Sequence, residues 1–317
     1  MKKISLFIFL FLTILQSGCL TTSNEELKKR PIAAFKSIKI ESVSLSDIVL
    51  CVELEITNPY VISIDVNSAI IEAYIEGERL VNTSSKNPLC IIGEKTASHS
   101  FKINLKWNDI SRASSNYMDK EEIVLKIVSL MNVKLPAIPG LPESIMLTYT
   151  TEKKLPALKP EIAFTNYNYT FPSRESIAKA LAKAKKSPLA LVRILGLFAG
   201  SESEEASENL SDMDLMFGVD FDFNIINHTK SKITIDRVYY DINLNNIPFV
   251  RGISAKVKNE GNKSTARLEN RLNTRSLHRS FISSFAKKKF NLQMGGYAII
   301  KFPSEISSEP VVFNFGK

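Results

Sequence analysis

The feature that most constrains this chain is a run of two-residue alternation around position 50. Apolar side chains occupy every second position over 50–56, with polar or small ones between them. Successive side chains of a β-strand point to opposite faces, so this period predicts a strand with one buried face. Asn58-Pro59 should end it, because proline has no N–H for a ladder and asparagine closes turns readily. The β-branched run 62–75 predicts a second strand, and Gly77 marks a hairpin turn.

The same order of features returns in the second half of the chain. Five apolar residues alternate with polar or small ones over 217–225, and Asn227 follows that run as Asn58 follows the first. Placing Asn227 on Asn58 aligns the next residues without a gap as far as position 249. Repetition of strand, turn, strand and turn in one register predicts two copies of one supersecondary unit.

The shared pattern is an alternating strand, the Asn58-Pro59 stop, a β-branched strand and the turn at Gly77. It resembles the late embryogenesis abundant type 2 family, also called the water-stress and hypersensitive-response (WHy) domain, whose members are small antiparallel β-sandwiches. The second copy has His228 and Asn246 at the proline and glycine positions. Asparagine tolerates a positive φ, so the turn chemistry is kept. The resemblance implies two tandem β-sandwiches and a link to stress or desiccation.

The other alternating segments complete a mainly β fold of two tandem antiparallel β-sandwich domains, the second with a helical insertion. We expect the first domain at 35–158 and the second at 159–317, with the boundary at the prolines and lysines of 156–160. Each domain should also carry one short helix before its closing strand. These helices are predicted over 120–130 and 277–285.

One segment, 173–214, has no counterpart in the first copy. Apolar residues at helical spacing, interrupted by Pro188, predict two short helices, the first rich in lysine and the second apolar. The acidic stretch 201–214 predicts a solvated linker back to the sheet. The helices could lie on an anionic membrane surface or pack on their own sandwich. Residues 172–200 carry +5, six basic side chains against one acidic, and 201–214 carry −6, which favours packing on the sandwich.

The N-terminus has the layout of an exported lipoprotein precursor. Two lysines precede an apolar run too short to span a bilayer, which needs about 20 apolar residues, and small residues lead into Cys19. The segment resembles a lipobox, although its first two positions depart from the strictest form. We expect 1–18 to be a signal peptide, Cys19 to carry the lipid, and 19–34 to be a linker on the envelope side of a membrane, in the periplasm or at the cell surface. An ordinary secretory signal with an incidental cysteine is the alternative.

Charge and cysteine content narrow the partners and the compartment. The formal net charge of +8 falls to +6 when Lys2 and Lys3 leave with the signal. This mild excess suits anionic lipid or cell-wall polymer, and nucleic acid is not expected as a partner. Disulfides persist outside the cytoplasm, so Cys51 and Cys90 could form one or remain free thiols.

Sequence motifs that mark enzymes are not found. His99, His228 and His278 are far apart and none has a second ligand at metal-binding spacing, so neither a metal nor another cofactor is expected. There is no Gly-x-Ser-x-Gly elbow and no glycine-rich phosphate loop. We therefore expect a lipid-anchored, non-catalytic envelope protein whose two modules bind an envelope protein, lipid or polymer. The alternative is a hydrolase or transferase with a site that sequence spacing does not reveal.

Overall fold

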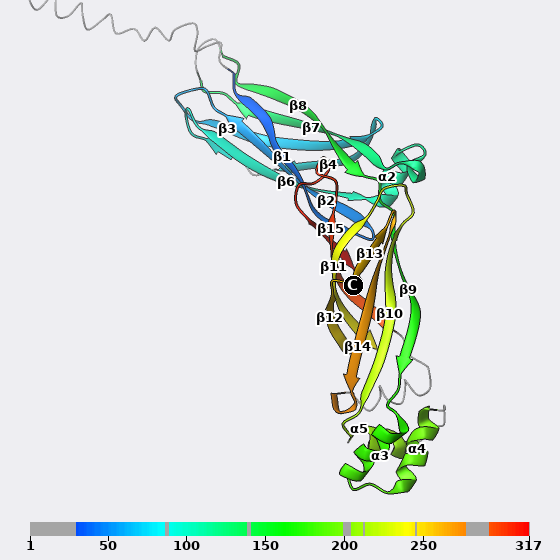
Figure 1. Cartoon of the computed structure of the whole chain (residues 1–317). Helices are drawn as coiled ribbons and strands as arrows, with labels where there is room; N and C mark the ends of the chain where they lie inside the picture. Colours follow the sequence, from blue (N-terminus) through cyan, green and yellow to red (C-terminus); the bar gives the residue numbers. More distant parts are fainter. Residues whose placement is uncertain are drawn as a thin grey trace, which may run out of the picture.

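The structure, a computed structural model, describes residues 30–85, 89–137, 141–198, 204–211, 213–244, 246–276 and 292–316. In these residues the protein is mainly β, with antiparallel sheets and a few short helices, as the alternating sequence predicts. Figure 1 shows an elongated molecule in which two β-rich halves follow each other and three helices lie beyond the second half. Within the described ranges no helix is both long and apolar enough to cross a membrane.

The first half forms the strands β1 (Ile32–Ser44), β2 (Asp47–Thr57), β3 (Ile64–Ile75), β4 (Glu78–Ser85), β5 (Leu89–Ile91), β6 (Thr96–Lys106), β7 (Glu122–Lys134) and β8 (Ser144–Pro156). One layer has the order β1-β2-β6, and the other has the order β4-β3-β7-β8 with β5 beside β3. Helix α2 (Trp107–Ala113) and the 3-10 turn η2 (Tyr117–Asp119) connect β6 to β7.

The second half forms β9 (Pro160–Thr170), β10 (Met216–Asn227), β11 (Thr234–Leu244), β12 (Ile247–Ser254), β13 (Val257–Glu260), β14 (Lys263–Asn273), β15 (Leu292–Lys301) and β16 (Val311–Phe315). Helices α3 (Arg174–Lys183), α4 (Pro188–Phe198) and α5 (Glu204–Ser211) lie between β9 and β10, and the 3-10 turn η3 (Thr274–Ser276) follows β14. The Ser173 hydroxyl caps α3 by accepting from the N–H of Ser176 at 3.1 Å.

The two halves have the same strand order. The layer β1-β2-β6 corresponds to β9-β10-β14, and β4-β3-β7-β8 corresponds to β12-β11-β15-β16. The short extra strands differ, because β5 joins β3 in the first half and β13 joins β14 in the second. The helices lie between β9 and β10, where the first half has only the tight turn between β1 and β2.

One sheet joins the two halves. β16, at the end of the chain, runs parallel to β1, with Ser42 opposite Val312 and Ser44 opposite Asn314. This pair produces a seven-stranded sheet of order β12-β11-β15-β16-β1-β2-β6. The sequence predicts antiparallel sandwiches and gives no sign of this parallel contact. Halves that share a sheet and a core are held far more firmly than domains joined by a linker alone.

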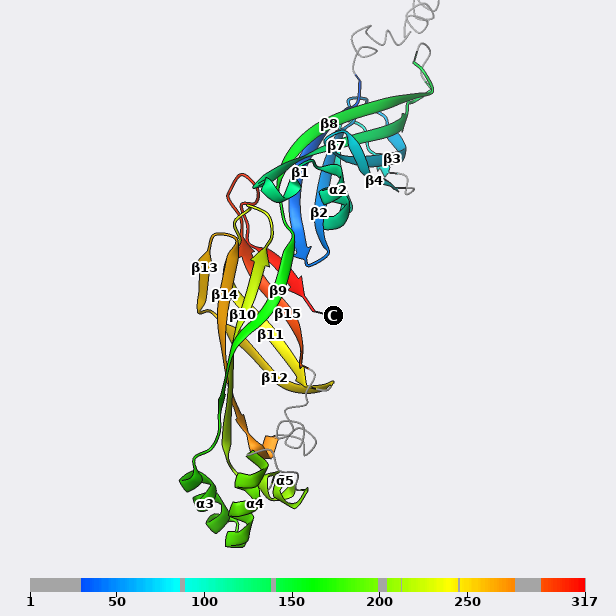
Figure 2. The same cartoon turned by 90° about the vertical axis from the view of Figure 1, so that its right-hand side faces the viewer.

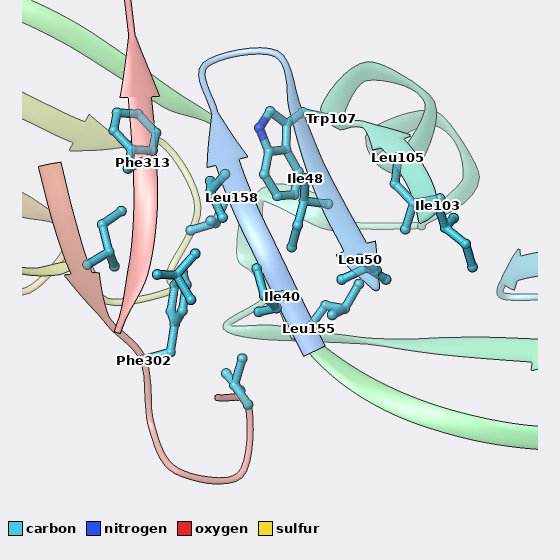
Figure 3. Packing of buried hydrophobic residues seen from close by; sticks show 14 of the residues in the cluster. Ile40, Ile48, Leu50, Ile103, Leu105, Trp107, Leu155, Leu158, Phe302 and Phe313 are labelled. Carbon is cyan, nitrogen blue, oxygen red and sulfur yellow. The ribbon is translucent and has the colours of Figure 1, made fainter. Parts of the chain in front are cut away.

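The hydrophobic core is also continuous between the halves. Residues 157–159, between β8 and β9, form the linker between the two halves. Figure 3 shows Phe302 and Phe313, from the end of the chain, together with Ile40 of β1 and Leu158 of this linker. The alternation of β2 supplies the first half of this core, where side chains such as Leu50 are 0% exposed. Each large side chain buried in this way contributes about 1.5–3 kcal/mol.

The helix predicted over 120–130 is wrong, because β7 crosses this segment. The side chains of β7 alternate between buried and more exposed positions, and Ile123 and Ile127 are among the buried ones. Their branched side chains favour a pleated surface over a helix. The first half has α2 as a short helix instead, with Trp107 buried. The helix predicted over 277–285 lies outside the described residues.

The inserted helices form a small bundle with its own core. α3, α4 and α5 share a hydrophobic cluster separate from the main core, in which Ile177, Ile194 and Leu210 are each 0% exposed. The prediction that the helices pack on the sandwich is therefore wrong. The prediction of a solvated linker over 201–214 is also wrong, because α5 lies there and buries Ala206 and Leu210. These two apolar residues are four apart and share one helix face among acidic neighbours.

Candidate functional site

The two asparagines of the repeated pattern are buried hydrogen-bond centres. Asn58 directly follows β2 and is 0% exposed. Its Nδ2 donates to the carbonyl oxygens of Ile62 at 2.8 Å and Ile91 at 3.0 Å, and its Oδ1 accepts from the N–H of Tyr60 at 3.0 Å. Pro59, which lies between, has no N–H that needs a partner. This side chain therefore closes the loop after β2 from the inside and ties it to β5.

Asn227 ends β10 and is also 0% exposed. Its Nδ2 donates to the carbonyl oxygen of Ser231 at 2.8 Å, four residues ahead, as Asn58 does in the first half. It also donates to the Thr229 hydroxyl at 2.7 Å, and two further bonds reach the linker between the halves. Nδ2 donates to the carbonyl oxygen of Ala157 at 3.2 Å, and Oδ1 accepts from the N–H of Lys159 at 2.7 Å. The second asparagine thus fixes the linker where the first fixes β5.

The two positions at which the second half departs from the sequence pattern have structural reasons. His228 stands where the first half has Pro59, and its backbone N–H donates to the carbonyl oxygen of Lys159 at 3.1 Å. A proline could not make this bond. Asn246 stands where the first half has Gly77, and both have positive φ, 64° and 89°, in two-residue hairpin turns.

Tyr117 holds the same linker from the first half. Its hydroxyl donates to the carbonyl oxygen of Leu158 and accepts from the N–H of Leu158, both at 2.8 Å. The side chain is 3% exposed, and this burial raises the pKa of the phenol above its ordinary value. The linker is therefore fixed between Tyr117 of the first half and Asn227 of the second.

A charged cluster lies beside this junction, at the turn between β3 and β4. Glu76 accepts from the ammonium of Lys120, from the N–H of Ser115 at 3.0 Å and from the hydroxyl of Ser114 at 2.8 Å. These contacts stabilise the carboxylate and lower the pKa of Glu76 to about 2. The carbonyl oxygen of Lys120 also accepts from the N–H of Lys230 at 3.2 Å. The cluster therefore connects this turn to the second half.

Ser114 and Lys120 have the spacing of a serine–lysine catalytic pair, with 2.9 Å between Oγ and Nζ. The directions of their hydrogen bonds indicate another role. A nucleophilic serine needs a neighbouring base that accepts its proton. Here the Ser114 hydroxyl donates to Glu76, and the Lys120 ammonium donates to both of them. The three side chains fix the β3–β4 turn against the end of α2.

A small cavity opens between the two layers of the first half. Its lining is apolar, with side chains such as Leu54 and Met131, and His99 is its one titratable residue. His99 packs edge-on against Phe101, with 4.6 Å between ring centroids. A ligand site usually has several converging polar groups, which this lining does not provide.

The other predicted site residues lie apart from these contacts. Cys19 lies outside the described residues. Cys51 is on β2 and Cys90 is on β5, in different sheets, and both are free cysteines, so the disulfide that the sequence left open is not formed. Across the described part of the chain, no three His, Cys, Asp or Glu side chains group together as metal ligands would.

No family model and no curated protein matches the chain. Some solved structures are similar to it, with low TM-scores. A solution structure from Arabidopsis thaliana has a TM-score of 0.34 and 10% identity, covering 39% of this chain and 80% of its own. One described as a late embryogenesis abundant (LEA) protein has a TM-score of 0.33 and 14% identity, covering 44% and 79%. Red sea bream transglutaminase has a TM-score of 0.26 and 9% identity, covering 92% and 32%. Scores this low assign neither a family nor an activity.

Sequence reasoning located the asparagines but missed the residues that complete the junction. Tyr117, Glu76 and Lys120 follow no local period, and their partners are distant in sequence. The only local signal in the sequence was the position of Glu76 directly before the turn glycine Gly77. In the structure Glu76 has a positive φ of 49°. A two-residue hairpin turn of this kind needs positive φ at both positions, so its side chains project from the end of the sheet.

Replacement of Asn227 by alanine tests the fixation of the linker. Asn227→Ala leaves the N–H of Lys159 and the buried carbonyl oxygen of Ser231 without this partner. Since each such loss costs about 1–3 kcal/mol, we expect urea denaturation to give a free energy of unfolding lower by about 3 kcal/mol. Asn104→Ala, at an exposed position of β6, is the matched control and should change it by less than about 0.5 kcal/mol. Equal effects of the two variants would contradict the assignment.

The low pKa of Glu76 predicts how acid weakens the junction. Its folded pKa of about 2 lies below the ordinary 4.5, so the unfolded chain takes up the proton first as the pH falls. The stabilisation is complete above pH 4.5 and is lost as the pH falls toward 2. The difference in unfolding free energy between the wild type and Glu76→Gln should therefore shrink in this window, measured by urea unfolding at several pH values. The control is Glu152→Gln, at an exposed position of β8. If the difference in unfolding free energy between the wild type and Glu76→Gln stays constant down to low pH, the Glu76 carboxylate does not stabilise the junction.

Proposed function

We propose that this chain is a non-catalytic, lipid-anchored protein of the bacterial cell envelope, built from two copies of a unit that resembles the LEA type 2 family. The observation that carries the duplication is the equivalence of Asn58 and Asn227. Each follows or ends the same strand of its half, is fully buried, and donates to the carbonyl oxygen four residues ahead. The shared strand order of the two halves supports the same proposal.

The anchor in this proposal is Cys19, after removal of the signal peptide 1–18. Residues 19–31 would then connect the lipid to β1, which begins at Ile32, three residues before the domain start that the sequence predicts. β1 begins at the end of the molecule opposite α3, α4 and α5 (Figures 1 and 2). An anchored protein would therefore direct its helices away from the membrane that holds its lipid.

The two copies would act as binding modules for an envelope protein, lipid or polymer. Among the described residues, their sheets end in strands such as β8 and β9, each of which pairs with another strand along one side only. An edge strand presents unpaired N–H and C=O groups that an extended segment of a partner can join. The resemblance to the LEA type 2 family adds a role under stress or desiccation to this proposal.

The contacts of the deeply buried or strongly shifted polar groups support a structural role for them. Such groups often mark catalytic sites, but they also occur where a fold is held together. Glu76 is bonded to Lys120 and fixes a turn, whereas Tyr117 and Asn227 are bonded to the backbone of the linker. Each is fully accounted for by the contact that it makes within the chain.

Substitution of Cys19 tests the anchor. In cells given labelled palmitate, the wild type should incorporate the label and enter the detergent phase, because each buried methylene contributes about 0.8 kcal/mol to membrane binding. Cys19→Ala should lose the label and move to the aqueous phase. Cys51→Ala and Cys90→Ala are matched controls that should keep it. Label retained by Cys19→Ala would rule out this anchor.

A further inference from the structure

The end of the helical bundle exposes two apolar side chains that the fold does not use. Leu189 is 57% exposed and Val192 is 66% exposed, three residues apart on α4. The opposite face of α4 carries Ala190 and Ile194, which are buried in the core of the bundle. Residues three apart share one face of a helix, so Leu189 and Val192 form a single small patch.

Basic residues occupy α3 and the short connection that leads into α4. Lys179 and Lys183 are exposed on α3, and Lys185 is exposed in the short connection to α4. Within the described part of the chain none of these three lysines makes an ion pair. The acidic helix α5 packs against α4, where Glu205 pairs with Arg193. On α3 and its connection to α4, these three exposed lysines outnumber the exposed Glu175, so the positive charge there is in excess.

We propose that this patch, Leu189 and Val192 of α4 together with Lys179, Lys183 and Lys185 of α3 and its connection to α4, docks on an anionic phospholipid membrane. The two apolar side chains would enter the headgroup region while the ammonium groups contact lipid phosphates. A protein partner fits less well, because a stable protein interface buries about 800 Å² on each side, far more than two side chains expose. The charge is complementary to anionic lipid, and the location at the extreme end of the molecule gives access to a surface (Figures 1 and 2).

The helices are suited to this task because they do not depend on the patch for folding. Ile177, Leu181 and Ile194 already hold α3 and α4 together in a separate core. α4 starts at Pro188, and the Ser187 hydroxyl accepts from the N–H of Leu189 at 3.2 Å, which fixes the first turn that carries the patch. The patch is thus presented on a preformed structure.

With the anchor of the proposed function, the protein would contact membrane at both ends and connect two surfaces. That arrangement rests on lipidation at Cys19, whereas docking of the helices does not. The two are therefore tested separately, docking with an unlipidated chain and lipidation with the palmitate label.

The test is flotation of a chain that starts at residue 20 with vesicles of phosphatidylethanolamine and phosphatidylglycerol. Every core residue of the described structure lies between 33 and 315, so this chain keeps both cores. We expect it to float with these vesicles, to lose binding as salt is raised, and to remain at the bottom with phosphatidylcholine alone. Leu189→Ser with Val192→Ser, and separately Lys183→Glu with Lys185→Glu, should each reduce binding at least about tenfold.

Control variants carry single changes of the same kind elsewhere on the surface. Ile253→Ser replaces an apolar side chain of β12 that is 64% exposed, and Lys256→Glu reverses an exposed charge of the second half. Both should float like the wild type, and all variants should keep the wild-type melting curve because the changed positions are exposed. No flotation of the wild type, or equal flotation of the tip variants and the controls, would overturn the proposal. Loss of the palmitate label alone would remove the anchor and leave this result intact.

Discussion

The parallel pair of β16 and β1 is the contact on which the arrangement of the molecule depends. It brings the last strand of the chain beside the first, so that one sheet of seven strands runs through both halves. The shared core packs against this sheet, and Phe313 of β16 is 0% exposed within it. Without this pair, the halves would be connected mainly through the linker and its hydrogen bonds.

The hydrogen bonds of the linker fix the direction of one half relative to the other, in addition to the shared sheet and core. Tyr117 and Asn227 hold adjacent backbone groups of the linker from opposite halves, and Glu76 with Lys120 fixes the turn beside them. Buried backbone groups with these partners cannot shift without losing hydrogen bonds. The direction of the first half relative to the second is thus set by a few buried bonds, and with it the distance between the start of β1 and the helical bundle.

Local periodicity explains which parts of the fold were predictable. Alternation over 50–56 and 217–225 correctly predicts strands, because the order of apolar and polar residues shows which face of each strand is buried. The segment 120–130 was misassigned, since its short run of apolar residues fits a helix or a strand and only pairing with β3 and β8 decides. The β16–β1 pair could not be predicted, because it joins residues about 270 positions apart and nothing local records it.

The candidate site, like the fold, was predictable from the sequence only where local patterns mark its residues. Asn58 and Asn227 were identifiable as strand ends from the repeated pattern, but their burial and their carbonyl partners depend on how the loops fold back over them. The insertion was recognised as helical and basic, yet its charge sum suggested packing on the sandwich. The bundle has its own core instead, because α5 supplies apolar side chains that the acidic composition of 201–214 concealed.

The most direct test of this account is a distance measurement between the two ends of the molecule. Spin labels at Ile32→Cys, an exposed position at the start of β1, and at Lys183→Cys, an exposed position of α3, can be introduced into a chain from residue 20 with both internal cysteines replaced by serine. Double electron–electron resonance should then give one narrow distance distribution, and removal of β16 should broaden it. A broad distribution in the intact chain would show that the halves move independently and would contradict the account.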